Sequence, residues 1–351
     1  TLGIVLLVVF AAVAQDEEQG TRRALLIGIN NYKSDRIPNL MGALNDIERM
    51  ARVLTTRYGF EAGNIRLARD EQATRKGLLR ELERFVGEVG PKDVVYIHYS
   101  GHGGRATTTD KKLKGDNGYD EGLVPMDIGD SEANYLRDLE MVYLLKSMVD
   151  KQLIVTVVLD SCHSGGATRG LGGAVPRGID EIDTTERPTA SLVATPEELA
   201  ATWQDLSGGQ TRALKPASGW FLEPQGYTLL AACRESESAY EFPFEGGERN
   251  GALTYWLLDS LGSMSAGTSY KTLHDRVLAK VKSWMPVQTP LLQGDGNRAV
   301  FGSQQIAVCH AIPVMSVDET TGSVALNGGE VHGLREGSLL AIYAPGTTDC
   351  T

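Results

Sequence analysis

Two short apolar runs, each followed at once by a glycine-rich polar segment, constrain the fold of this chain most. Val94–His98 precedes Tyr-Ser-Gly-His-Gly-Gly, and Leu153–Leu159 precedes Asp-Ser-Cys-His-Ser-Gly. Short apolar runs bounded by turn residues are typical of strands buried on both faces, as in a parallel sheet. Functional side chains gather at the carboxyl ends of such strands. The sequence therefore predicts an α/β fold in which His102 and Cys162 meet at one edge of the sheet.

Strand-like and helix-like segments alternate along most of the chain. Strands are expected at 23–29, 65–68, 94–98, 153–159 and 227–232, and helices at 43–58, 74–89, 139–148, 253–261 and 270–284. Gly59 is placed to end the first helix and Thr74 to cap the second. This alternation predicts a mainly parallel sheet with helices on both faces.

Composition divides the chain into five parts. A length of 351 residues with 42% hydrophobic composition is enough for one large core and a small extra module. We expect part of a signal peptide at 1–14, a large α/β part at 22–164, a flexible insertion at 165–219, a second part of the same α/β unit at 220–304, and the start of a β-rich module at 305–351. The insertion is rich in Gly, Pro and Thr and longer than ordinary loops.

The apolar run Leu2–Ala14 is too short to cross a bilayer and ends in small residues, as before a signal-peptide cleavage site. Export to the periplasm or outside the cell is therefore expected, with a buried core helix in a cytoplasmic protein as the alternative. The net charge of −11 and the lack of a basic tract argue against nucleic acid as a partner. No transmembrane helix is expected.

The four cysteines form no Cys-x-x-Cys pair, which argues against a zinc ribbon or a thioredoxin-type site. An exported protein can form a disulfide between two of Cys233, Cys309 and Cys350, and the sequence does not indicate which pair.

Cys162 and His102 are the candidates for nucleophile and base, since a thiol needs a neighbouring base to react at neutral pH. His163 is the weaker base candidate, because adjacent side chains on an extended segment point to opposite faces. The backbone N–H groups of Cys162 and Gly103 are candidates for an oxyanion hole. The alternatives are an inert buried thiol and a loop histidine without a role.

These residues carry a resemblance to a known family. Both motifs, together with Gly-Ala-Leu-Asn-Asp at 42–46 and Gln-Thr-Pro at 288–290, resemble the metacaspases and bacterial orthocaspases among the caspase-like peptidases, over about residues 22–302. The resemblance implies a caspase-type sheet with large-subunit and small-subunit parts. It implies a cysteine-type endopeptidase with His102 and Cys162 as its dyad and no cofactor for the chemistry.

The resemblance also places Asp46, Ser100 and Asp160 in the pocket for the residue before the scissile bond. Two carboxylates with no arginine expected nearby attract a long cation and repel an aspartate, which predicts substrates with Arg or Lys at that position. As alternatives, Asp46 is an acid in the first turn of a helix and Asp160 a turn former.

Metacaspases often need calcium, and the acidic stretch from Asp110 to Asp138 has the oxygen ligands that this ion prefers. Asp116 and Asp138 are the candidate ligands for calcium as an activator. The match is partial, because Arg137-Asp138-Leu139 holds one acid where the family has two, and Arg169 stands where the family has another acid. A solvated acidic loop is the alternative.

A peptidase of this specificity would cut itself in the insertion, with Arg169, Arg177 and Arg212 as candidate sites. Two other functions are weighed. In a cysteine phosphatase the loop that cradles phosphate needs a shorter spacing than the six residues between Cys162 and Arg169. A catalytically latent interaction module is the second, and the sequence does not choose among a surface, a glycan and a protein partner as the ligand of the β-rich module.

Overall fold

The computed structural model describes residues 20–108, 110–114, 118–130, 133–163, 173–185, 193–206, 218–221, 226–265, 267–306, 314–318, 320–326, 335–338 and 340. The chain divides into two compact units, Thr1–Gln304 and Gln305–Thr351, at the boundary expected for the β-rich module. The signal peptide expected at 1–14 lies outside the described residues, so export stays a prediction. Within the described part, no helix has the length and apolar character needed to cross a membrane.

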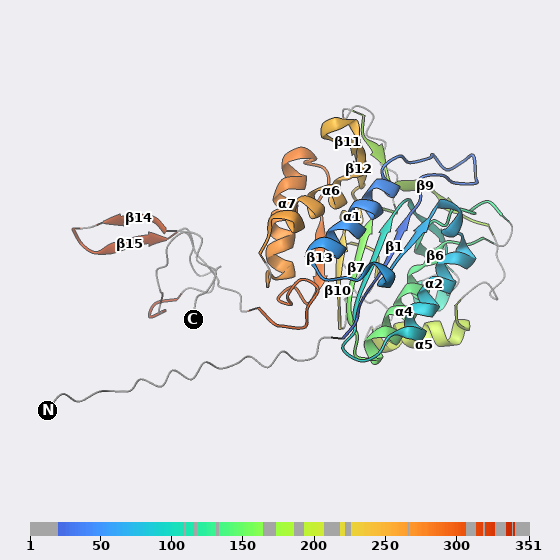
Figure 1. Ribbon diagram of the computed structural model, residues 1–351, viewed down its shortest axis with the longest axis horizontal. Helices are drawn as coiled ribbons and strands as arrows, with labels where there is room; N and C mark the ends of the chain where they lie inside the picture. The colour runs from blue at the N-terminus through green and yellow to red at the C-terminus, as the bar shows by residue number, and fades with distance from the viewer. Residues whose placement is uncertain are drawn as a thin grey trace. The chain divides into compact units, whose positions relative to one another are not determined.

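A six-stranded sheet is the centre of the first unit (Figure 1). In spatial order its strands are β13 (Leu291–Gly294), β10 (Tyr227–Ala231), β7 (Ile154–Asp160), β3 (Val94–Ser100), β1 (Arg22–Gly28) and β2 (Ile65–Arg69). All neighbours are parallel except β13, which runs antiparallel to β10. The predicted α/β fold with a mainly parallel sheet is confirmed. The sequence did not predict β13, whose short run next to Pro290 resembles a loop.

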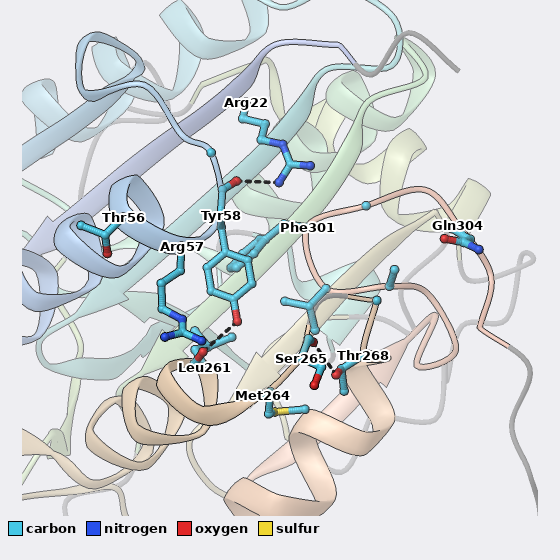
Figure 2. A pocket seen from close by; sticks show the side chains of 15 residues that line it. Arg22, Thr56, Arg57, Tyr58, Leu261, Met264, Ser265, Thr268, Phe301 and Gln304 are labelled. Carbon is cyan, nitrogen blue, oxygen red and sulfur yellow. Dashed lines mark hydrogen bonds between the residues drawn. The ribbon is translucent and has the colours of Figure 1, made fainter. Parts of the chain in front are cut away.

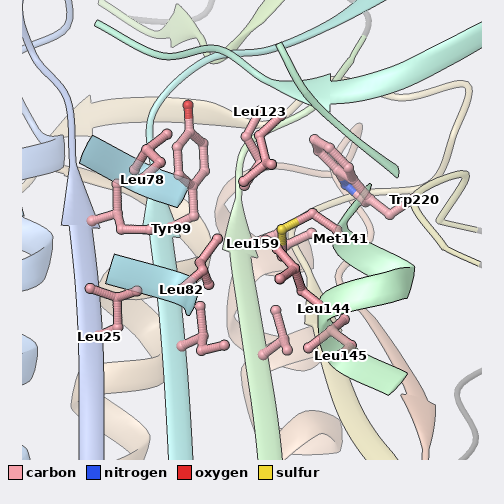
Figure 3. Close-up of a cluster of buried hydrophobic side chains, with 14 of the residues drawn as sticks. Leu25, Leu78, Leu82, Tyr99, Leu123, Met141, Leu144, Leu145, Leu159 and Trp220 are labelled. Carbon is pink, nitrogen blue, oxygen red and sulfur yellow. The ribbon is translucent and has the colours of Figure 1, made fainter. Parts of the chain in front are cut away.

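Helices cover both faces of this sheet, as predicted (Figure 1). One face carries α1 (Ala43–Arg57), α6 (Ala252–Ser263) and α7 (Tyr270–Trp284), and the other carries α2 (Arg75–Glu88), α4 (Asp138–Asp150) and α5 (Pro196–Leu206). Neighbouring residues of β1 belong to opposite cores: Leu25 lies in the cluster beneath α2 and α4 shown in Figure 3, and Leu26 in the cluster beneath α1 and α6. Alternate side chains of a strand point to opposite faces, so strands apolar at every position must be covered on both.

Local signals place the helix ends as expected. The Thr74 hydroxyl accepts a hydrogen bond of 3.0 Å from the backbone N–H of Gly77 and caps α2. Helix α1 ends at Arg57, and Gly59 follows with φ of 67°, a conformation that glycine adopts without steric cost.

Two small sheets lie beside the central one, and the sequence did not predict them. The first consists of β6 (Leu136–Arg137), β5 (Tyr119–Leu123), β4 (Gly103–Thr107) and β9 (Gly178–Asp183), and the second of β12 (Arg249–Gly251), β11 (Tyr240–Pro243) and β8 (Val175–Pro176). Strands β8 and β9 and helix α5 fall within 165–219, the expected flexible insertion. β8 has only two residues and β9 is mostly polar, so only their pairing to β11 and β4 identifies them.

The second unit contains one described hairpin. Strands β14 (Val314–Asp318) and β15 (Ser323–Leu326) pair antiparallel, with Gly322 at φ of 68° in the turn. This hairpin agrees with the short strands and glycine turns expected there.

Candidate active site

Parallel pairing of β3 and β7 brings the two glycine-rich motifs together. Ser100 and Asp160 are register partners at the ends of these strands. His102 and Cys162 each follow two residues later, and both side chains are 1% exposed. Carboxyl ends of parallel strands lie at one edge of a sheet, so the candidate base and nucleophile share that edge.

The His102 imidazole has one nitrogen engaged and one available. Its Nε2 lies 2.8 Å from the carbonyl oxygen of Pro38, which only accepts, so Nε2 carries the proton and Nδ1 a lone pair. Nδ1 is buried without a hydrogen-bond partner in the described part of the chain. Burial lowers the pKa of His102 to about 4, although the hydrogen bond to the Pro38 carbonyl raises it. The ring is therefore neutral at pH 7. A neutral ring with a free lone pair can accept a proton.

The Pro38 carbonyl is a part of the site that the sequence did not predict. It belongs to a loop after β1, and no side chain marks it. The other candidate base, His163, lies edge-on against Trp220 with ring centroids 5.0 Å apart.

The three predicted pocket residues lie together, and Arg177 fills the space between them. Its Nη2 is 2.8 Å from Asp46 Oδ2, and its Nη1 is 2.6 Å from Ser100 Oγ and 3.6 Å from Asp160 Oδ2. All four side chains are fully buried. The expectation that no arginine lies near these carboxylates is therefore wrong. The arginine comes from the chain's own segment at 175–183, which the sequence analysis treated as part of a loop.

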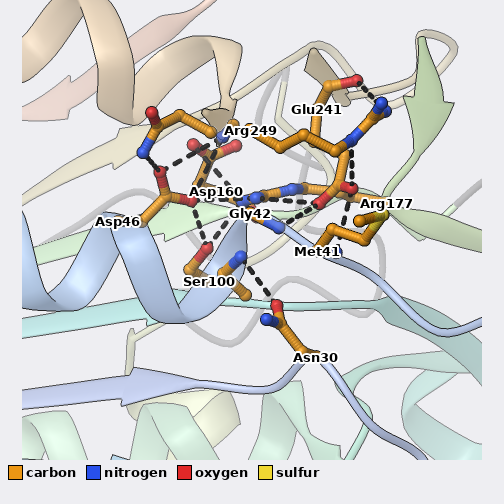
Figure 4. Close-up of polar contacts among 12 residues, drawn as sticks. Asn30, Met41, Gly42, Asp46, Ser100, Asp160, Arg177, Glu241 and Arg249 are labelled. Atoms are coloured by element: carbon orange, nitrogen blue, oxygen red, sulfur yellow. Dashed lines mark hydrogen bonds and ion pairs between the residues drawn. The ribbon is translucent and has the colours of Figure 1, made fainter. Parts of the chain in front are cut away.

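A third carboxylate, Glu241 of β11, completes the pocket. Its Oε2 lies 3.3 Å from Arg177 Nη2 and also accepts the backbone N–H of Gly42 (Figure 4). Its Oε1 accepts the backbone N–H of Met41 and the side-chain Nε–H of Arg249. Glu241 is not predicted from the sequence, because it belongs to no motif and reaches the pocket only through the second small sheet.

The pocket is built to hold a cation. Burial raises the pKa of Asp46 to about 6, and Arg177 opposes that rise. Burial acts against the charged form of Arg177, but Asp46, Asp160 and Glu241 outweigh it and raise the pKa of the guanidinium. Burial of Glu241 raises the pKa of its carboxyl group, but Arg177 and the hydrogen bonds to Glu241 outweigh burial and lower that pKa. A buried charge is stable only with such partners, so the pocket requires a positive side chain.

The backbone of Arg177 is held as firmly as its side chain. Its carbonyl oxygen accepts hydrogen bonds of 3.1 Å from the N–H groups of both Gly103 and Cys162, the two groups predicted for the oxyanion hole. Its own N–H donates to the Ala239 carbonyl at 2.8 Å. Strand β8 before it pairs with β11, and β9 after it pairs with β4. An extended segment thus crosses the site with one carbonyl between two N–H donors.

Glycine is required at two positions of this site. A Cβ on Gly103 would lie 2.4 Å from the Cys162 carbonyl oxygen, and one on Gly251 would lie 2.2 Å from Asp160 Oδ2 and 2.4 Å from Arg177 Nη1. These distances are far below van der Waals contact, so a side chain at 103 would displace the Cys162 backbone, and one at 251 would displace the Arg177 guanidinium from Asp160.

The remaining predicted residues do not gather at this site. Arg169 and Arg212 lie outside the described residues, as do Asp116, Cys309 and Cys350. Asp138 is buried at the start of α4 and forms an ion pair with Lys114.

The Cys162 and Cys233 side chains are buried free thiols joined by a hydrogen bond. That bond and burial raise the pKa of Cys233 well above its ordinary value. Cys233 therefore forms no disulfide in this structure.

A separate cavity of about 760 Å³ opens between the end of α1, the end of α6 and the segment at 299–304 (Figure 2). Its lining includes Arg22, Arg57, Tyr58 and Phe301. It shares no residue with the Arg177 pocket and takes no part in the chemistry described above.

Comparison with known proteins relates this chain to one family. The family described as "Metacaspase, peptidase C14 domain" matches residues 22–169. Metacaspase-1A of Aspergillus oryzae is 36% identical over 154 residues, covering 42% of this chain and 35% of that protein. Metacaspase-1B of Aspergillus fumigatus is 29% identical over 266 residues, covering 69% of this chain and 62% of that protein. The chain thus matches about a third to three-fifths of the length of these relatives. Both are fungal, so a bacterial origin stays a prediction.

A solved structure shares the fold. The crystal structure of protein GSU0716 from Geobacter sulfurreducens superposes with a TM-score of 0.52, covering 81% of this chain and 97% of that one, at 22% sequence identity. At that identity the likeness concerns the fold alone.

Proposed function

This chain belongs to the caspase-like metacaspase family, with the peptidase C14 domain at residues 22–169, and we propose that it is a cysteine-type endopeptidase that cleaves after Arg or Lys. One observation carries the proposal. Arg177 has its guanidinium among three carboxylates and its carbonyl oxygen between the N–H groups of Gly103 and Cys162. A substrate residue must be held in this way before its carbonyl is attacked.

The proposed chemistry follows the groups around that carbonyl. Cys162 Sγ attacks the carbonyl carbon while its proton passes to His102 Nδ1, and the oxygen becomes an oxyanion bound by the two N–H groups. The C–N bond then breaks as His102 returns the proton to the leaving amine. Water, deprotonated by His102 Nδ1, hydrolyses the thioester and frees the carboxylate product and the thiol.

The pocket supports arginine over lysine as the residue before the scissile bond. Arg177 contacts Asp46 and Glu241 through Nη2, and Ser100 through Nη1. A lysine ammonium has the charge but not the planar fork, so it cannot make all of these bonds at once. An aspartate would meet three carboxylates and be repelled.

Peptide cleavage tests this specificity. We expect fluorogenic Ala-Val-Pro-Arg, which copies residues 174–177, to be cleaved fastest, the Lys analogue more slowly and the Asp analogue not at all. Cys162→Ala should abolish all cleavage while leaving the protein folded. Cleavage of the Asp analogue would contradict the role proposed for the pocket.

We further propose that the Arg177–Gly178 bond is cut by the chain itself, because it already lies in the substrate position. Mass spectrometry should find chain ends at Arg177 and Gly178 in the wild type and neither in Cys162→Ala. Arg177→Gln should block this cut, while Arg169→Gln and Arg212→Gln serve as matched controls. The same cut in Cys162→Ala would point to another protease.

A latent interaction module is the second candidate, since the buried Arg177 leaves no space in the pocket for another cation. Folded wild-type protein that neither cuts itself nor cleaves any of the three peptides would support that function instead.

A further inference from the structure

Lys114 lies within a group of buried carboxylates. The group consists of Lys114 of the short helix α3 (Lys111–Lys114), Asp120 and Glu121 of β5, Arg137 of β6, and Asp138 of α4. The ammonium is 3.3 Å from Asp120 Oδ1 and 3.7 Å from Glu121 Oε2, and it forms a closer ion pair with Asp138 Oδ2. The lysine side chain is 6% exposed and the carboxylates 0–1%. A protein cation thus occupies the centre of the group.

The carboxylates need that cation. Burial raises the pKa of Asp138 well above its ordinary value, and Lys114 opposes the rise. Burial lowers the pKa of Lys114, but the carboxylates of Asp138, Asp120 and Glu121 outweigh burial and raise that pKa. Without a counter-ion, buried carboxylates of this kind would be strongly destabilising.

The oxygen atoms that face this centre are not arranged for calcium. Calcium takes six to eight oxygen ligands, whereas Asp120 here gives Oδ2 to Arg137 Nη1 at 3.0 Å and Oδ1 also to the Thr108 hydroxyl at 2.9 Å. The Lys114 ammonium stands 4.9 Å from the Trp203 ring centroid, so α5 covers the lysine as well. In the described part of the chain, no group of three or more His, Cys, Asp or Glu residues is placed to hold a metal ion.

We propose that the Lys114 ammonium is a built-in cation that takes the place of calcium and makes this protein independent of that ion. The charge it supplies acts close to the active site. Ala106 of β4 pairs with Asp120, and Gly103 of the same strand donates one of the two N–H groups to the Arg177 carbonyl. The Lys114 group therefore anchors the hairpin that carries half of the oxyanion hole.

Calcium binding by the wild type is the first test, and it needs no catalytic activity. Isothermal titration with calcium chloride should give no binding heat up to millimolar calcium, and thermal unfolding should be the same in calcium as in chelator. A saturable site with a dissociation constant below about 1 mM, or a midpoint raised by calcium, would overturn the proposal.

Removing the ammonium is the second test. Lys114→Ala should lower the unfolding midpoint by roughly 10 °C, because it leaves buried carboxylates unpaired. Lys114→Arg keeps the charge and should stay insensitive to calcium. Lys112→Met, an exposed position on the same helix, is the matched control and should change nothing. A Lys114→Ala midpoint equal to that of the control would contradict the proposal.

The inference rests on the proposed function only where activity is concerned. If the wild type cleaves no peptide in calcium or in chelator, the proposed function fails, while the titration and unfolding data still decide the role of Lys114. If Lys114→Ala does not fold, the wild-type titration decides alone.

Discussion

At the scale of single residues, the proposed specificity for arginine depends on a carboxylate that no motif marks. Glu241 faces Arg177 opposite Asp46 and is held by two backbone N–H groups. We expect Glu241→Gln to lower kcat/KM for an Arg peptide roughly 10- to 100-fold, mainly through KM, since the lost ion pair is made in the ground state too. Glu248→Gln, an exposed acid on the same hairpin, is the control and should match the wild type. Peptide kinetics on both variants would reject this role if Glu241→Gln kept full activity.

At the scale of elements, α2 shows how a local signal becomes stability. Thr74 caps its start, and a Cβ on Gly87 in its last turn would meet nothing within 4 Å. Thr74→Ala should cost about 1 kcal/mol of unfolding free energy, and Gly87→Ala should add up to about 0.5 kcal/mol. Urea unfolding of the two variants measures both changes. Equal effects of the same sign would show that neither the cap nor the helix backbone sets the stability of α2.

At the scale of the whole molecule, buried histidines make the fold sensitive to acid. Burial lowers the pKa of His98 to about 3 and that of His102 to about 4. In the unfolded chain these histidines take up a proton near pH 6.5, whereas in the folded chain they do not. Each should therefore lower the free energy of unfolding by about 2 kcal/mol between pH 7 and pH 5. Asp46 acts in the opposite direction, because its raised pKa of about 6 favours the folded state as pH falls.

Substitution of His98 separates these contributions. Its ring hydrogen-bonds to the Tyr96 and Thr254 hydroxyls inside the core. Urea unfolding at pH 7 and pH 5 should show His98→Gln losing about 2 kcal/mol less than the wild type over that interval. An equal loss in both proteins would mean that His98 is protonated in the fold or retains its low pKa after unfolding.

The sequence by itself determined the five parallel strands of the central sheet, five of the helices and the two motifs at the strand ends. Apolar runs, caps and turn glycines act between residues close along the chain, so they are readable without coordinates. Parallel pairing of two such strands then sufficed to predict that His102 and Cys162 lie at one edge.

Only the tertiary structure decided what surrounds that edge. The Pro38 carbonyl on His102, Glu241 in the pocket and Arg177 between its carboxylates are contacts between segments far apart along the chain. The contacts of Arg177 and Glu241 depend on the pairing of short strands, whose length and composition resemble those of loops. A lone arginine in a loop carries no local sign of the acids it will meet, because those acids gather only when the chain has folded.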